Sequence, residues 1–151
     1  MSVAKNMVAA LIQKLGLPAP LFDNNVCVIQ FDAHLLNFHV DDERDELRCF
    51  VRVTDVPADR EARLNLYRKL LQANAFGRRT AGGQLGIDEN ETFVVFSLVF
   101  PVANLAVDDL KVIVQNLLNL TEDFQRELGQ AEDAAPASIA SPSPAGFGLR
   151  V

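Results

Sequence analysis

Four side chains could support metal binding or thiol chemistry: Cys27, Cys49, His34 and His39. A zinc site or a catalytic thiolate would need several such groups close together. Both cysteines lie inside apolar runs that are typical of strands, and neither has a histidine close by in the sequence. The histidines are five residues apart, which places them on opposite faces of a strand. We therefore expect buried, unreactive cysteines, exposed histidines and no metal site. A disulfide between the two cysteines remains an alternative, because their number alone allows one.

The glycine-rich stretch over 82–86 suggests phosphate binding as a second possible function. It lacks the Gly-Lys-Ser/Thr ending of a phosphate loop and precedes a strand rather than a helix, so we expect a flexible turn. The carboxylates cluster in turns and at helix starts, and no acid pair is visibly placed in an apolar pocket that would shift its pKa. We therefore expect no catalytic residue and no cofactor. The alternative is a small enzyme that uses a pocket on the sheet.

The overall charge narrows the classes of partner. The chain has 151 residues, a formal net charge of −6 and a pI of about 4.8. An acidic chain repels nucleic-acid backbones and anionic lipid headgroups, so we expect neither nucleic acid nor a membrane as a partner. No apolar run approaches the ~20 residues that cross a bilayer, and the N-terminus lacks the features of a signal peptide. The expected location is the cytoplasm.

Hydrophobic periodicity divides the chain into helices and short strands. Apolar residues at helical spacing predict helices over 3–15 and 107–128, and another that opens at Pro57 and ends at Gly77. Alternation predicts strands over 26–31, 35–40, 47–53, 84–88 and 92–100. The expected fold is α+β, in the order α-β-β-β-α-β-β-α, with a mostly antiparallel five-stranded sheet. The Ala/Ser/Pro-rich composition over 130–151 predicts a disordered tail after one domain over 1–129.

The chain contains more apolar residues than one small α+β layer can cover. Hydrophobic residues make up 49% of the sequence, and two helices on one face of the sheet leave its other face open. On that open face we place Val26, Val28, Leu35 and Phe50. Exposed apolar patches mark interaction sites, and open strand edges offer backbone groups to an extended peptide.

Two arrangements would cover this surplus. In the first, a second copy of the chain covers the second helix and the last strand in a two-fold dimer, and a partner binds the open face. In the second, the third helix and the tail cover everything and the protein is a monomer. We expect the first arrangement.

Consecutive segments of the chain carry a family resemblance. Leu70-Leu71-Gln72-Ala73-Asn74-Ala75-Phe76-Gly77 is followed by Gly82-Gly83-Gln84-Leu85-Gly86-Ile87-Asp88 and then by an apolar strand. This resembles the class I type III secretion chaperones, the Tir chaperone family, in which a helix ending in Leu-x-x-Ala-Asn leads to a glycine-rich turn and a Leu-x-Leu-Asp-like strand. Gly86 and Ile87 stand where a small or apolar pair is usual. The resemblance covers about residues 3–128, and the order of elements, the size and the acidic pI agree with it.

The resemblance implies a function. Such chaperones are homodimers in the bacterial cytoplasm that use no cofactor and bind the N-terminal region of one or more secreted effectors in extended form. They keep this segment ready for the secretion apparatus, whose ATPase is a further expected partner. Mapped onto this chain, the resemblance implies a dimer contact at Leu66, Tyr67, Leu70 and Leu71. Strand alternation adds Val26, Val28, Leu35 and Phe50 as effector-binding residues. A regulatory or stress protein with the same fold is the alternative.

Overall fold

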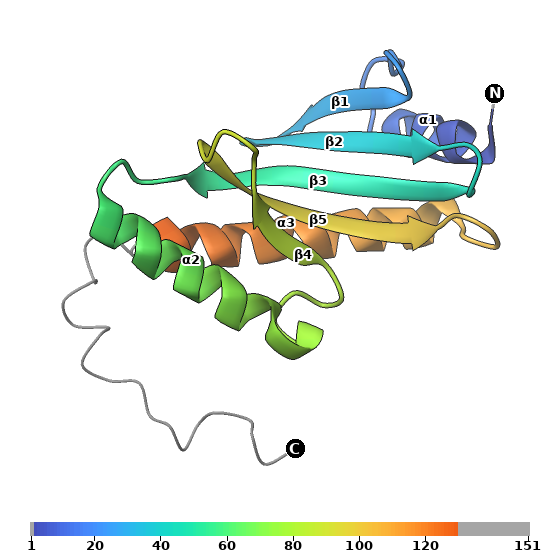
Figure 1. The fold of residues 1–151 in the computed structure, drawn as a ribbon. Coiled ribbons are helices and arrows are strands. Elements are labelled where there is room, and N and C mark those ends of the chain that lie inside the picture. Colours follow the sequence, from blue (N-terminus) through green and yellow to red (C-terminus); the bar gives the residue numbers. More distant parts are fainter. Residues whose placement is uncertain (1, 130–151) are drawn as a thin grey trace.

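The computed structural model describes residues 2–129, which form three α-helices and a five-stranded sheet (Figure 1). The helices are α1 (Val3–Lys14), α2 (Arg60–Asn74) and α3 (Val107–Gly129), with a short 3-10 helix, η1 (Ala75–Gly77), after α2. The strands are β1 (Val26–Phe31), β2 (His34–Asp41), β3 (Glu46–Asp55), β4 (Gln84–Ile87) and β5 (Phe93–Pro101). The order confirms the expected α+β fold. The tail predicted over 130–151 lies outside the described residues.

All neighbouring strands pair antiparallel, in the order β1-β2-β3-β5-β4. Strands β1 and β4 are therefore the two edges of the sheet. The register aligns Val28, Asn37, Phe50 and Ser97 in one row across four strands. Because side chains alternate along a strand, residues of one row project from the same face.

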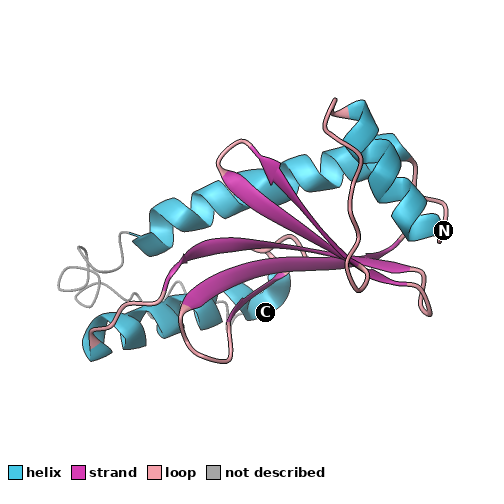
Figure 2. Cartoon of the chain, turned by 90° about the horizontal axis from the view of Figure 1, so that it is seen from above, coloured by secondary structure: helices cyan, strands magenta, loops and turns pink. Residues whose placement is uncertain are grey.

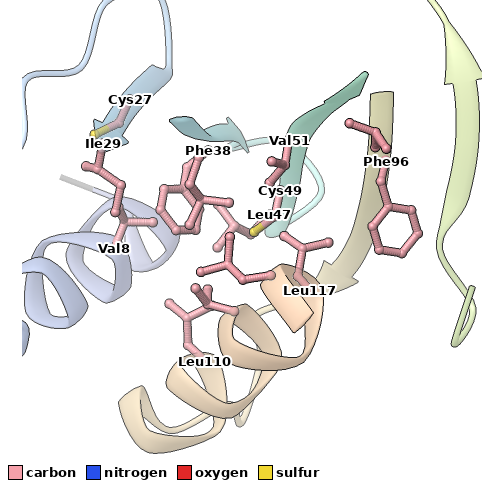
Figure 3. Close-up of a cluster of buried hydrophobic side chains, with 14 of the residues drawn as sticks. Val8, Cys27, Ile29, Phe38, Leu47, Cys49, Val51, Phe96, Leu110 and Leu117 are labelled. Carbon is pink, nitrogen blue, oxygen red and sulfur yellow. The ribbon is translucent and has the colours of Figure 1, made fainter. Parts of the chain in front are cut away.

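Helices α1 and α3 pack against each other and cover one face of the sheet (Figure 2). The strand side chains that point toward these helices are buried, whereas their neighbours along each strand are partly or fully exposed. Figure 3 shows this core, in which α1 and α3 meet the inward rows of the sheet; its labelled residues are Val8, Cys27, Ile29, Phe38, Leu47, Cys49, Val51, Phe96, Leu110 and Leu117. Each large apolar side chain buried here contributes about 1.5–3 kcal/mol.

Helix α2 begins at Arg60, three residues after the expected start at Pro57. Asp59 is its N-cap, because the Asp59 carboxylate accepts a hydrogen bond from the backbone N–H of Ala62 at 2.9 Å. Aspartate is among the strongest N-caps, since it satisfies a helix donor that has no partner inside the helix. The helix then runs along β4, at the edge of the sheet (Figure 1).

Asn74 ties the end of α2 to β4. Its side-chain Nδ2 donates to the backbone oxygen of Leu85 at 2.8 Å, and its Oδ1 accepts from the backbone N–H of Leu85 at 2.9 Å. These are backbone groups of an edge strand, which no neighbouring strand satisfies. The asparagine of the Leu-x-x-Ala-Asn pattern therefore closes the edge of the sheet at Leu85.

Gly83 lies where the chain passes from η1 into β4, closely packed on β5. A Cβ atom at this position would come within 2.7 Å of the Phe96 ring and of the Ser97 backbone oxygen. We therefore expect Gly83→Ala to lower the free energy of unfolding by about 1–3 kcal/mol, the usual effect of overpacking. Urea unfolding measures this. Gly86→Ala is the matched control, because nothing lies within 4 Å of its added Cβ; equal losses in both variants would contradict the close approach.

Asp88 organises the turn between β4 and β5. Its Oδ1 accepts backbone hydrogen bonds from Thr92 at 2.6 Å and from Phe93 at 2.8 Å, and its Oδ2 accepts one from the Thr92 hydroxyl. Desolvation opposes ionisation of the Asp88 carboxyl, but these hydrogen bonds outweigh it and lower its pKa to about 2. The charged carboxylate is therefore the form that the folded turn prefers.

The lowered pKa of Asp88 predicts a stability change in acid. Because an unfolded aspartate has a pKa of about 3.9, the stabilisation is complete above that pH. It is lost as the pH falls from about 4 through the folded pKa of about 2. Thermal unfolding followed by circular dichroism between pH 2 and 6 measures this loss. Asp88→Asn should reduce the slope of melting temperature against pH in this window, and an unchanged slope would assign the acid sensitivity to other carboxyls.

Candidate protein-binding surfaces

The first candidate surface is the sheet face that α1 and α3 leave uncovered, which faces the viewer in Figure 1. Val28 is 54% exposed and Leu35 is 57% exposed, and both project from this face. Val26 and Phe50 lie on it as well and are partly exposed. The structure therefore brings together the four residues that strand alternation placed there. Their role in binding stays a prediction.

Strand register adds an exposed apolar residue of β5 to this face. Val99 of β5 is 43% exposed and aligns with Arg48, which aligns in turn with His39 and Val26. The alternation of β5 predicts that Val99 points to the opposite face from its neighbours Leu98 and Phe100. The sequence does not predict that β5 lies beside β3, which follows only from the order of strands in the sheet. We call Val26, Val28, Leu35, Phe50 and Val99 the open-face patch.

Two arginines project from the same sheet face as the open-face patch, in different settings. Arg52 pairs with Asp55, and its guanidinium lies 4.7 Å from the centre of the Phe93 ring. Arg48 is exposed and forms no ion pair with any residue of 2–129. Asp41 and Glu46 project from this face as well, beside Arg48 and Val99, so the exposed apolar residues lie among charges of both signs.

The outer edge of β1 offers unpaired backbone groups beside this patch. The N–H of Val40 donates to the oxygen of Asn25 at 2.9 Å, so Asn25 and every second residue after it turn their backbone groups toward β2. Val28 and Gln30 have the opposite parity, and their N–H and C=O groups point away from the sheet. An extended segment could pair with them as an added strand.

The second candidate surface lies on α2, and here the sequence prediction needs correction. Leu66 is 1% exposed and Leu70 is 6% exposed, so both pack into the core of their own chain and are not available to a second copy. Leu71 is 72% exposed, and Tyr67 is partly exposed. The four residues assigned to one contact thus point in two directions.

Leu64 is the residue that the sequence prediction missed on α2. It is 53% exposed and precedes Leu71 by seven residues, with Tyr67 between them, so the three lie on one side of the helix. The Tyr67 hydroxyl donates to Glu91 Oε1 at 2.6 Å, which fixes the ring beside the β4–β5 turn. We call Leu64, Tyr67 and Leu71 the α2 stripe; a spacing of three and seven residues is the signal that could have identified it.

Phe76, in the short helix η1 after α2, is another exposed apolar residue. Its ring is 71% exposed, and its backbone has φ +65°, in the left-handed region that favours glycine. Ile87 of β4 is 38% exposed, on the strand that α2 accompanies. Residues in such conformations cost of order 1–3 kcal/mol and are found at functional sites more often than elsewhere.

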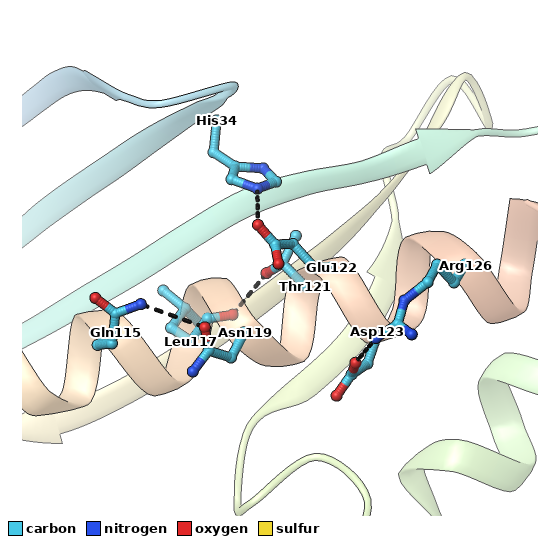
Figure 4. A network of polar contacts seen from close by, with 8 residues as sticks. All are labelled: His34, Gln115, Leu117, Asn119, Thr121, Glu122, Asp123 and Arg126. Atoms are coloured by element: carbon cyan, nitrogen blue, oxygen red, sulfur yellow. Dashed lines mark hydrogen bonds and ion pairs between the residues drawn. The ribbon is translucent and has the colours of Figure 1, made fainter.

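The groups that could do chemistry are not assembled into a reactive site. Desolvation raises the pKa of the Cys27 thiol and of the Cys49 thiol, which disfavours the reactive thiolate. The expectation that His34 is exposed is wrong, because His34 is 7% exposed and its Nε2 lies 3.4 Å from Glu122 Oε1 on α3 (Figure 4). In the same figure the buried Thr121 hydroxyl donates to the Leu117 backbone oxygen at 2.8 Å. Both polar side chains thus have structural partners.

No group of three potential metal ligands lies together anywhere in residues 2–129. A cavity of about 300 Å³ lies between α2 and α3, where Ala73, Phe124 and Leu128 meet an Arg79–Glu127 ion pair. It contains no nucleophile beside a general base. Within the described part of the chain, no helix is long and apolar enough to span a bilayer.

Comparison with protein families identifies the chain. The model of the Tir chaperone protein (CesT) family matches residues 6–125, which include all five strands, α2 and most of α1 and α3. The chain belongs to the Tir chaperone family. The family resemblance carried by 70–77 and 82–88 is thereby confirmed. Comparison with curated proteins by sequence gives no match.

Solved structures share the fold of this family member. The ExsC–ExsE complex contains a chain that is 22% identical, with a TM-score of 0.70 over 85% of this chain and 97% of that one. The HopA1–SchA chaperone–effector complex contains one that is 21% identical, with a TM-score of 0.62 over 81% and 92%. YbjN from E. coli, described as a putative transcription regulator, is 12% identical, with a TM-score of 0.59 over 80% and 88%.

Proposed function

We propose that this Tir chaperone family member is a cytoplasmic type III secretion chaperone that acts as a homodimer. It binds the N-terminal segment of one or more secreted effectors in extended form, keeps that segment soluble, and presents it to the secretion ATPase. It catalyses no reaction and uses no cofactor. The observation that carries the proposal is the match to the family model over residues 6–125, together with a chaperone–effector complex among the structures of the same fold.

The α2 stripe supports the homodimer. Leu64 and Leu71 are more than half exposed, on the side of α2 opposite the buried Leu66 and Leu70. In a two-fold contact the same stripe is used by both copies, so the helices meet side by side. Tyrosine and other aromatic side chains are enriched at such contacts. The proposed dimer contact is therefore Leu64, Tyr67 and Leu71, rather than the set that included Leu66 and Leu70.

The open-face patch and the β1 edge support binding of an extended segment. The patch offers Val28 and Leu35 as exposed apolar contacts, next to the outward backbone groups of Val28 and Gln30. An added strand gains main-chain hydrogen bonds at the edge, and alternate side chains of that strand reach the patch. The β4 edge is less suitable, because Asn74 already occupies the outward groups of Leu85.

Two measurements test the proposal together. Light scattering of the purified chain should give twice the mass of one copy, and sequencing of the protein that co-purifies from the native host should identify a secreted effector. Fragments of that effector should then locate the bound segment near its N-terminus. A monomer that captures no such segment would refute the proposal.

The likeness to YbjN supports one competing function, a regulatory protein that has this fold without a role in secretion. The two functions differ in the bound partner. Deletion of the gene should abolish secretion of the co-purifying protein if the chain is a secretion chaperone. If the chain is instead a regulatory protein without a role in secretion, deletion should leave secretion intact and change the levels of the transcripts that it regulates.

A further inference from the structure

The chain that precedes β1 doubles back onto the outer edge of that strand. The backbone N–H of Asp23 donates to the oxygen of Val26 at 2.9 Å, and the N–H of Val26 donates to the oxygen of Asp23 at 2.8 Å. Between them Asn24 has φ +47° and Asn25 has φ +65°. Two central residues with positive φ form the type I′ turn of a tight hairpin, which asparagine tolerates. The residues before Asp23 therefore approach β1 antiparallel, along its free edge.

Side-chain burial shows that this approach already has the alternation of a strand. Continuing the register from Asp23 and Val26 places Phe22 beside Cys27 and Leu21 beside Val28. Phe22 packs against the core, as the buried Cys27 does. Leu21 is 89% exposed, on the side of the partly exposed Val28. No hydrogen bond joins Leu21 to Val28 within the described structure, so the pairing stops after one pair of residues.

We propose that residues 21–23 form a strap that closes along β1 by pairing Leu21 with Val28. The effect of the strap on binding rests on the proposed function. The backbone groups of Val28 with which the strap would pair are the same groups that an effector strand would use. The closed strap and the bound effector therefore exclude each other. Closure also brings two exposed apolar side chains together, which covers part of the open-face patch when no effector is bound.

A reversible cross-link tests the strap in the full chain. Directly paired residues of this hydrogen-bonded type have Cα atoms about 5.5 Å apart, within the range that a disulfide spans. The double variant Leu21→Cys with Val28→Cys should form a disulfide on treatment with glutathione disulfide. The control is Leu21→Cys with Gln30→Cys, in which the second thiol lies about 6.6 Å further along the strand. The natural cysteines are buried and do not compete.

The two double variants decide whether the strap closes. A disulfide at 21/28 that forms at least tenfold faster than the one at 21/30 is the expected result. Failure to form at 21/28, or equal rates in both variants, would show a segment that does not follow this register and would overturn the strap. This readout needs no effector, so it decides the strap even if the proposed function fails.

Effector capture then tests the exclusion. The probe is the N-terminal segment of whichever secreted protein co-purifies with the wild-type chain. The oxidised 21/28 variant should bind it at least tenfold more weakly than the same variant after reduction. Equal binding in both states would overturn the exclusion, whereas absence of any captured segment with the wild type would refute the proposed function instead.

Discussion

The variant Leu71→Asp is expected to be a monomer. Leu71 is 72% exposed on the α2 stripe, and a two-fold axis brings it into the proposed contact twice. Placing an unpaired aspartate in an apolar contact costs about 2 kcal/mol or more per copy, so the dimer loses about 4 kcal/mol. That corresponds to association weakened about a thousandfold. Light scattering after size exclusion, at a fixed concentration, measures the mass of each variant.

Two further variants separate dissociation from unfolding. Val112→Asp places the same charge on α3 at a residue that is 59% exposed, and it should leave both the mass and the circular dichroism unchanged. Leu66→Asp places the charge in the core, where the side chain is 1% exposed, and it should unfold the chain. A dimer that survives Leu71→Asp would move the contact to another part of the surface.

The second large effect is expected at Phe50. Its ring lies in the row formed by Val28, Asn37 and Ser97 on the open-face patch, and it is partly exposed there. Phe50→Asp should leave folding nearly intact and weaken effector capture by well over ~1 kcal/mol, because a partner would lose a buried aromatic contact. Isothermal titration with the co-purifying effector segment measures the change.

The control for Phe50 is again Val112→Asp, which lies on α3, away from the open-face patch. Its affinity for the effector segment should equal that of the wild type. A Phe50→Asp variant that binds as well as the wild type would remove Phe50 from the site, and the patch would then depend on Val28 and Leu35.

Local patterns predicted most of the fold because each element has a clear period. The alternation in 47–53 identified the inward residues of β3, such as Cys49, and the outward ones, such as Phe50. The start of α2 was misplaced because Pro57 and Asp59 are both start signals, and the hydrogen bond from Ala62 to the Asp59 carboxylate decides between them.

The candidate surfaces were predicted less completely, because they depend on contacts between distant segments. The helical period of α2 allows a wide apolar sector, and only packing against the sheet and α3 shows that Leu66 is buried while Leu64 is exposed. His34 and Glu122 are 88 residues apart in the chain, so no local pattern pairs them. Val99 joins the open-face patch only through the order of strands.

The amide of Asn74 has a further consequence for how copies of this protein could stack. Continuous growth of a cross-β filament requires each molecule to pair with a neighbour at both edges of its sheet. At the β4 edge the outward N–H and C=O of Leu85 are already hydrogen-bonded to Asn74, so a strand of another molecule cannot pair with them. A molecule with a single receptive edge ends a growing filament instead of extending it, so the closed β4 edge protects this protein from fibril formation.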